Sequence, residues 1–316
     1  MPGSSTGSFT DAADYQESLV DLISEIVVTQ AGAFHARVTR ASLRKLQILR
    51  AQETTSRVAF FTFSPQSVFV SFAADFVRPL IWRGVALQPG EVMLHGRGER
   101  LHQRIVGGGG WGLISLSAES FAGFGKALTG VPLTVPRRGQ VLRPQAADRA
   151  NLLRLHAAAA RLAETNPQML ERPEVVRAMR QELAEALVTC LSGADVRNGS
   201  ATHERAADVM NKFEALLLSR PGMHWRMTEI SAALGVSDRT FRVCCAAFLG
   251  VSPHRYVHLR RLQLVRAAIL RADPMTTRIA DLAAEGGFTD LGRFAARYRA
   301  AYGEAPSMTL RRSAVA

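Results

Sequence analysis

Residues 277–294 read TRIADLAAEGGFTDLGRF, a stretch that carries the signals for two short helices joined by a tight turn. Ile279, Leu282 and Ala283 give the first helix an apolar face with helical spacing. Gly286-Gly287 supplies the turn, because glycine adopts backbone conformations that other residues avoid. The stretch therefore predicts a helix-turn-helix.

The second helix of this stretch is expected to begin after a capping side chain, either Thr289 or Asp290. Leu291, Phe294 and Tyr298 would then lie on its buried face. The opposite face would present to solvent Gly292, Arg293, Ala296 and Arg299.

A stretch of the same plan precedes it, MTEISAALGVSDRTFR at residues 227–242. Gly235 can take the positive φ that ends a helix, and Ser237 is a favourable N-cap. Asp238 suits the positive end of the helix dipole better than it suits base reading. The buried face is expected to hold Phe241, Cys245 and Phe248, and the outer face Arg239, Arg242, Val243 and Ala246.

Residues 256–271 lie between the two stretches and read as one helix, with Leu259, Leu262, Val265 and Ile269 inward. At ~1.5 Å per residue this helix would span ~24 Å, enough with its flanking turns to hold two recognition helices one DNA turn apart. Seven arginines and no acid lie between residues 239 and 272. This charge predicts a surface that meets DNA phosphates.

The region from about residue 203 to residue 311 resembles the DNA-binding domain of the AraC/XylS family of bacterial transcription regulators. The resemblance implies two helix-turn-helix units on a linker helix, entering adjacent major-groove segments of promoter DNA. It also implies recruitment of RNA polymerase, usually as an activator. Its most specific residues are Ile279–Ala283, Gly287–Asp290, Phe294, Tyr298-Arg299, Tyr302-Gly303 and Pro306-Ser307.

Carried over by position, the resemblance assigns DNA contacts to both second helices of the two units. The later unit departs from the family, since it presents Leu291, Gly292, Ala295 and Ala296 where polar residues are common. We therefore expect it to hold the DNA backbone, while the earlier unit discriminates sequence. The expected DNA-binding residues are Ser237, Asp238, Arg239, Thr240, Arg242, Val243, Asp290, Gly292, Arg293, Ala296 and Arg299.

The N-terminal half has a different pattern. From about residue 35 to residue 117, short apolar or alternating runs are separated by turn signals such as Pro89-Gly90 and Gly107–Gly110. Such spacing is typical of a β-sandwich or barrel. Residues 148–165 and 173–191 then show helical periodicity. The predicted class is α+β, with a flexible N-terminus at 1–20, a β-rich domain at 21–145, a helical region and linker at 146–200, and the double helix-turn-helix at 201–316.

Two finer expectations concern the ends of this half. Residues 1–18 are small and polar and are expected to be frayed, whereas residues 15–28 could form a short amphipathic helix. Residues 192–202 are rich in small and polar residues and read as a linker.

The β-rich half resembles, less specifically, the cupin-like sensor domain found upstream in many AraC/XylS regulators. The resemblance implies a small-molecule effector and a homodimer formed through helices, here within residues 148–191. The aromatics that would line a pocket include Phe69 and Phe72, with Arg97 or Arg100 as polar contacts; the alternative is that the aromatics are simply core. The expected effector-binding residues are Phe61, Phe63, Trp82 and Arg97.

Composition agrees with a DNA-binding protein of the cytoplasm. The 316 residues carry a formal net charge of +12, and all but three of the 39 basic residues are arginine, which suits phosphates and guanine edges. No apolar run approaches the ~18 residues of a membrane helix, and no secretory signal is visible. The three cysteines Cys190, Cys244 and Cys245 cannot form a disulfide framework.

Two other function classes are weaker interpretations. His95, Glu99 and His102 loosely suggest a cupin-type metalloenzyme with a DNA-binding tail, but His95-Gly96-Arg97 lacks the close second histidine, and ordinary surface histidines are the simpler reading. We therefore expect no metal, no cofactor and no enzyme activity. A non-specific architectural DNA binder is the other alternative. Cys245 is expected to be core and not a redox sensor.

Overall fold

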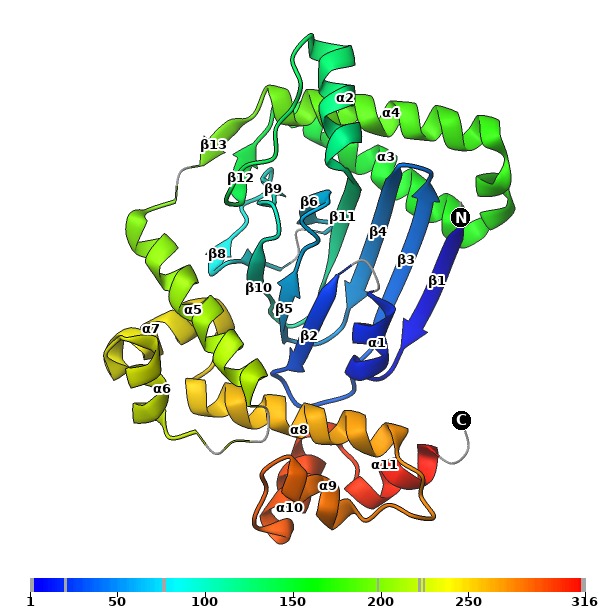
Figure 1. Ribbon diagram of the computed structural model, residues 1–316. Helices are drawn as coiled ribbons and strands as arrows, with labels where there is room; N and C mark the ends of the chain where they lie inside the picture. The colour runs from blue at the N-terminus through cyan, green and yellow to red at the C-terminus, as the bar shows by residue number, and fades with distance from the viewer. Residues whose placement is uncertain are drawn as a thin grey trace.

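The computed structural model describes residues 3–19, 22–75, 78–197, 199–220, 223 and 225–313. Its N-terminal half is a sandwich of two antiparallel sheets, shown with the C-terminal helices beneath it in Figure 1. The larger sheet has the order β1 (Ser4–Phe9), β3 (Ala36–Leu43), β4 (Leu46–Glu53), β11 (Gly109–Ser117), β6 (Ser67–Ala73), β9 (Val92–Leu94), β12 (Gln140–Arg143), β13 (Asp195–Arg197). The smaller sheet has the order β2 (Ile23–Val28), β5 (Arg57–Thr62), β10 (Arg100–Ile105), β7 (Leu80–Trp82), β8 (Val85–Ala86).

Alternation along the strands sends side chains to two separate cores. On β11, Trp111 and Leu113 point into the sandwich, where they pack with Phe61 of the smaller sheet. Ile114 and Leu116 point the other way, into a core that the helices of this half cover. The strand is therefore apolar on both faces, which is why it reads as a continuous apolar run.

Two antiparallel helices, α3 (Ala146–Thr165) and α4 (Pro173–Ser192), cover the outer face of the larger sheet (Figure 1). Leu152 of α3 and Leu183 of α4 are fully buried against it. These are the two helices that the periodicity predicts. Smaller elements beside them are α2 (Ala118–Thr129) and η1 (Pro167–Glu171).

The C-terminal helices dock on the outer face of the smaller sheet. Val27 and Val58 of that sheet share a core with Phe213 and Tyr256 of the helical domain. Helix α8 runs beneath β2 and the short helix α1 (Ala12–Ser18) (Figure 1). The helices are α5 (Ala201–Ser219), α6 (Met227–Leu234), α7 (Asp238–Leu249), α8 (Pro253–Arg271), α9 (Ile279–Glu285), α10 (Leu291–Tyr302) and α11 (Pro306–Ser313).

The structure confirms the α+β class but corrects the ends of the N-terminal half. Residues 4–9, expected to be flexible, form β1 and pair with β3 from Ser4↔Ala41 to Phe9↔Ala36. An edge strand needs only backbone partners, so its small polar side chains gave no apolar signal. The helix expected over residues 15–28 is wrong beyond Ser18, since residues 23–28 form β2. Met1, Pro2, Val20 and Asp21 lie outside the described residues.

The expected linker at residues 192–202 also contains a strand. β13 pairs with β12 at the edge of the larger sheet, from Val141↔Arg197 to Arg143↔Asp195. The chain is thus tied to the sandwich immediately before α5 begins. Among the described helices, none combines the length and apolar character that crossing a bilayer requires.

Candidate nucleic-acid interface

The first helix-turn-helix is formed by α6 and α7, as the sequence predicts. Gly235 ends α6 in the left-handed conformation, with a φ of 67°. Ser237 caps α7, because its Oγ accepts from the amide of Thr240 at 3.1 Å. Phe241 and Cys245 are buried in the core that α7 shares with α5. The local signals are therefore sufficient to place this unit.

The outer face of α7 is open to solvent. Arg239, Thr240 and Arg242 are exposed, and 63% of Val243 is accessible although it is apolar. Neither arginine forms an ion pair with an acid in the described part of the chain. Two unpaired guanidinium groups beside an exposed apolar residue are suited to reading base edges in a major groove.

The second helix-turn-helix is formed by α9 and α10. The side chain of Asp290, and not Thr289, caps α10, since its Oδ1 accepts from the amide of Arg293 at 2.9 Å. Phe288 closes the turn against Phe294, with ring centroids 4.9 Å apart. The predicted burial of Leu291 is wrong: 47% of this side chain is exposed, because it is the first residue of the helix and lies outside the core.

The outer face of α10 carries arginines separated by small side chains. Gly292, Arg293, Ala296 and Arg299 are all exposed, as predicted. Arg297 is exposed as well and was not singled out from the sequence, although its helical spacing from Arg293 is visible there. This face can hold phosphates through guanidinium groups and offers small side chains elsewhere.

A cavity of about 230 Å³ opens between the two units. Arg261, Arg293 and Arg297 are among its walls, together with His254 and His258. Burial, then the nearby charges of Arg297, His254 and Arg261, lower the pKa of His258 to about 4, so this ring is neutral at physiological pH. Arg261 and Arg297, together with Arg293, which pairs with Asp290 of the same cavity at 3.2 Å, suit a DNA phosphate between the two recognition helices.

The arginines of the linker helix do not all face DNA, which corrects the prediction from charge density. Arg260 and Arg266 are buried, with 4% and 6% of their surface exposed. Arg260 pairs with Glu25 of β2, Arg266 with Asp11 at the start of α1, and Arg271 with Glu17 of α1. These three acids come from the opposite end of the chain, so local charge patterning could not reveal them.

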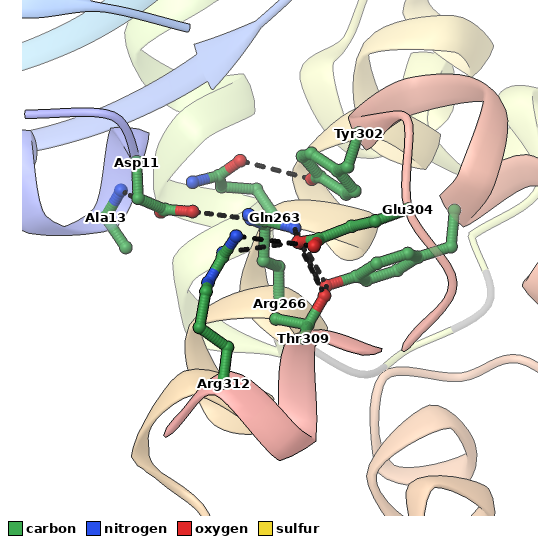
Figure 2. A network of polar contacts seen from close by, with 9 residues as sticks. Asp11, Ala13, Gln263, Arg266, Tyr302, Glu304, Thr309 and Arg312 are labelled. Carbon is green, nitrogen blue, oxygen red and sulfur yellow. Dashed lines mark hydrogen bonds and ion pairs between the residues drawn. The ribbon is translucent and has the colours of Figure 1, made fainter. Parts of the chain in front are cut away.

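Arg266 lies at the centre of a polar network that joins the two domains (Figure 2). Its guanidinium donates to Asp11, to Glu304 at 2.9 Å and to the hydroxyl of Tyr298 at 3.1 Å. Thr309 and Arg312 of α11 donate to the same Glu304 carboxylate. One side chain of α8 therefore contacts both the second helix-turn-helix unit and the N-terminal segment.

The histidines weighed as metal ligands are not on the surface, contrary to the simpler reading. His95 and His102 are each 1% exposed. Nε2 of His95 bonds Oγ of Ser71 at 2.7 Å inside the sandwich, whereas His102 faces outward and contacts Glu214 of α5 at 2.8 Å. Among the described residues, no three His, Cys, Asp or Glu side chains converge as metal ligands.

The cysteines are buried in the described structure. Burial raises the pKa of both the Cys244 and the Cys245 thiol. A buried thiol with a raised pKa is a poor nucleophile, which supports the core role expected of Cys245.

The aromatics expected to line an effector pocket divide into two groups. Phe61 and Phe63 are buried inside the sandwich near Trp82, whereas Phe72 lies on the other face of the larger sheet and contacts His156 of α3. The placement of Phe72 in that pocket is therefore wrong, because alternation along β6 separates it from Phe69. The side chain of Arg97 is exposed.

The helical domain matches a known protein family. Residues 230–312 match a family described as "Helix-turn-helix domain". A probable thc operon regulatory protein of Rhodococcus erythropolis is 35% identical over 85 residues, which cover 27% of this chain and 26% of that protein. A XylDLEGF operon transcriptional activator of Pseudomonas putida is 29% identical over 161 residues, covering 51% of this chain and 47% of that protein. These matches span half or less of the length of each relative.

The solved structures to which this chain is similar share little sequence with it. The AraC-like transcriptional activator CuxR is 15% identical, with a TM-score of 0.43, and the alignment covers 82% of this chain and 94% of CuxR. ToxT from Vibrio cholerae O395 is 13% identical, with a TM-score of 0.30, over 92% of this chain and 98% of ToxT.

Proposed function

We propose that this chain is a transcription regulator of the AraC/XylS type that binds double-stranded promoter DNA. The observation that carries the proposal is the pair of capped recognition helices, α7 and α10, with exposed arginines on their outer faces. Both helices are attached to one continuous helix, α8, which fixes their relative orientation.

The two recognition helices have different tasks in this proposal. Arg239 and Arg242 of α7 discriminate bases, since a free guanidinium can donate two parallel bonds to a guanine. Arg293 and Arg299 of α10 hold phosphates, and the small residues between them let the backbone of the DNA approach closely.

The remaining parts of the proposal concern the N-terminal half. The sandwich acts as a sensor for a small-molecule effector, and α3 and α4 supply the surface of a homodimer. The regulator works in the bacterial cytoplasm, recruits RNA polymerase as an activator and has no enzyme activity of its own. An effector would act by shifting the equilibrium between two arrangements of the DNA-binding domains.

Selection of binding sites from random DNA tests the proposal. The wild-type protein should enrich a defined sequence, the Arg242→Ala variant should lose preference at one or two positions, and the Arg293→Ala variant should bind more weakly with its preference unchanged. Loss of base preference from the Arg293 change alone would refute the division of tasks. Equal affinity for selected and random DNA at physiological salt would instead indicate an architectural binder.

Sedimentation of the full-length protein tests the dimer. We expect a concentration-dependent monomer–dimer equilibrium in the micromolar range or tighter. A single monomeric species at high concentration, with and without operator DNA, would contradict the dimeric part of the proposal.

A further inference from the structure

The cavity between the two helix-turn-helix units has histidines as well as arginines in its wall. His258 of α8 lines this cavity and also a neighbouring one of about 430 Å³, which lies between α8, α10 and the segment 28–31. His254 and Arg297 line both cavities as well. These three side chains therefore border two hollows of the helical domain at once.

The ring of His258 is half-buried and keeps its hydrogen-bonding capacity unused. Within the described residues, its nitrogens form no hydrogen bond, and the ring meets Phe288 edge-on with centroids 5.7 Å apart. A neutral imidazole carries one donor and one acceptor, and a protonated one carries two donors. The ring can therefore contact a group that enters the cavity.

The charged groups around His258 are nearly all cationic. Those on its own helix and those on α10 are positively charged or become so on protonation, and among the described residues that line the two cavities a single acid is present. The full set is His254, Arg255 and Arg261 on α8, Arg293 and Arg297 on α10, and the acid Asp290 at the start of α10.

The one acid is already engaged by its own helix. Asp290 accepts from the amide of Arg293 through Oδ1 and pairs with the Nε of the same residue through Oδ2 at 3.2 Å. Arg261 donates to the carbonyl of Gly287 at 3.2 Å. Arg297 is exposed and forms no ion pair in the described part of the chain. Asp290 therefore offsets Arg293, and no carboxylate offsets Arg297.

The position of the cavity suits a phosphate of the DNA backbone. Its walls come from α8, from α10 with the turn that precedes it, and from the beginning of α6, so both helix-turn-helix units contribute. Two recognition helices that enter successive major-groove segments on one face of DNA are separated by a minor groove. The backbone that borders this minor groove passes between the two units, where the cavity lies.

We propose that one phosphate of the DNA backbone enters this cavity between Arg297 and His258, and that the ring of His258 takes up a proton from solvent as it does so. This inference rests on the proposed function, since it adds control by protons to the same DNA-binding surface. The phosphate supplies the negative charge that the cavity lacks, and the protonated ring donates to a phosphate oxygen.

Proton uptake follows from the change in the surroundings of the ring. Without DNA, burial and then Arg297, His254 and Arg261 lower the pKa of His258 to about 4. An opposite charge within about 4–6 Å raises the pKa of a histidine by about 1–3. DNA affinity must then increase as the pH falls, because the complex binds a proton that the free protein does not. A rise of about 2 in the pKa makes the affinity about four-fold higher at pH 5.5 than at pH 7.5.

Fluorescence anisotropy of the full-length protein on the selected operator, at fixed ionic strength and at pH 7.5 and 5.5, tests the inference. His258→Gln keeps a polar side chain that does not titrate, so its gain in affinity between the two pH values should be about four-fold smaller than that of the wild type. His35→Gln is the matched control, because His35 is exposed on the N-terminal half and lines neither cavity, and it should keep the pH dependence of the wild type. Equal pH dependence in His258→Gln and the wild type would overturn the inference.

A second arm uses the wild-type protein and changes the DNA. Each phosphate between the two half-sites of the operator is replaced in turn by a neutral methylphosphonate. At one position, or at two adjacent ones, the pH-dependent gain in affinity should disappear, because the charge that protonates His258 is gone. A gain that survives at every position would overturn the inference, even if His258→Gln fails to fold.

The same measurements separate this inference from the proposed function. Tight binding to the selected operator with a pH dependence that neither His258→Gln nor any methylphosphonate alters would overturn the inference alone. Absence of preferential binding to any selected DNA at both pH values would overturn the proposed function. Circular dichroism at pH 5.5 verifies that each preparation is folded.

Discussion

Arg260 of α8 holds both carboxylate oxygens of Glu25 on β2, with Nε–Oε2 and Nη2–Oε1 distances of 2.7 and 2.8 Å. The pair joins the linker helix to the smaller sheet and is shielded on the side of Arg260, only 4% of which is exposed. Because α8 carries both helix-turn-helix units, a contact that orients this helix relative to the sandwich also orients both recognition helices. A movement of the sandwich relative to α8 would therefore change how both recognition helices are presented to DNA.

Glu25→Gln should weaken this docking. Removing one partner of a buried ion pair costs about 3–5 kcal/mol, and partial exposure of Glu25 reduces the expected loss to about 2 kcal/mol. We expect a lower midpoint of thermal unfolding and faster hydrogen exchange in α8. Glu17→Gln is the matched control, since its pair with Arg271 is exposed on both sides and should contribute less than about 1 kcal/mol. Equal effects of the two variants would show that burial does not make the Arg260–Glu25 pair stronger than the exposed Arg271–Glu17 pair.

Stability should fall as the pH is lowered from about 6.5 to 4, and His156 is one identifiable cause. Burial lowers the pKa of this ring to about 4, and its Nε2 lies 3.1 Å from the carbonyl oxygen of Leu49. Below pH 6.5 the unfolded chain takes up a proton that the folded chain refuses, so protonation favours unfolding. The depressed pKa corresponds to roughly 3 kcal/mol lost by pH 4.

The variant His156→Gln isolates this contribution. Glutamine can still donate to the Leu49 carbonyl but does not titrate. Urea unfolding at pH 7 and pH 4.5 should therefore show a smaller loss of stability in the variant than in the wild type. The same loss in both proteins would assign the acid sensitivity to other groups.

Prediction from the sequence succeeds where the deciding interactions are local. Gly235, Ser237 and Asp290 act on residues one turn away, so the helix-turn-helix units could be placed from short patterns. Glu25 and Asp11, which pair with Arg260 and Arg266, lie 235 and 255 residues away from them in the chain. Nothing in the linker helix alone distinguishes an arginine that meets phosphate from one that meets a distant acid.

A cavity at the edge of the sandwich, lined by Trp82 and Arg83, shows the same division. Trp82 could be singled out because a large aromatic in a β-rich half is conspicuous, but its neighbour Arg83 could not. β13 brings Arg197, and the start of α5 brings His203, to the wall of this cavity. Those residues fall in a segment that reads as a linker, where composition carries no information on contacts.

Gly286→Ala should destabilise the second helix-turn-helix unit. A Cβ at this position would lie 2.2 Å from Cγ2 of Val265, a residue buried on α8. Overpacking of this kind costs about 1–3 kcal/mol, measured as a lower midpoint of unfolding. Gly292→Ala is the control without a clash, because a Cβ there meets only Oδ1 of Asp290, at 3.5 Å. In this variant alanine should stabilise the helix by about 0.5 kcal/mol. The double variant Gly286→Ala/Val265→Ala removes the methyl group that the new Cβ would meet, so it should recover part of the stability lost in Gly286→Ala. If the stability losses of the two single variants simply add in the double variant, the clash with Val265 is not the cause.

Salt dependence of DNA binding should distinguish the two recognition helices. If Arg299 of α10 contacts a phosphate, Arg299→Ala weakens binding to every sequence alike and lowers the slope of log affinity against log salt by about 1. If Arg242 of α7 reads a base, Arg242→Ala costs about 1–3 kcal/mol on the selected operator and little on random DNA. Fluorescence anisotropy between 50 and 200 mM salt, on both DNAs, measures the two effects together. The reverse pattern, with Arg299 governing sequence preference and Arg242 governing the salt slope, would mean that the second unit is the reader despite its small side chains.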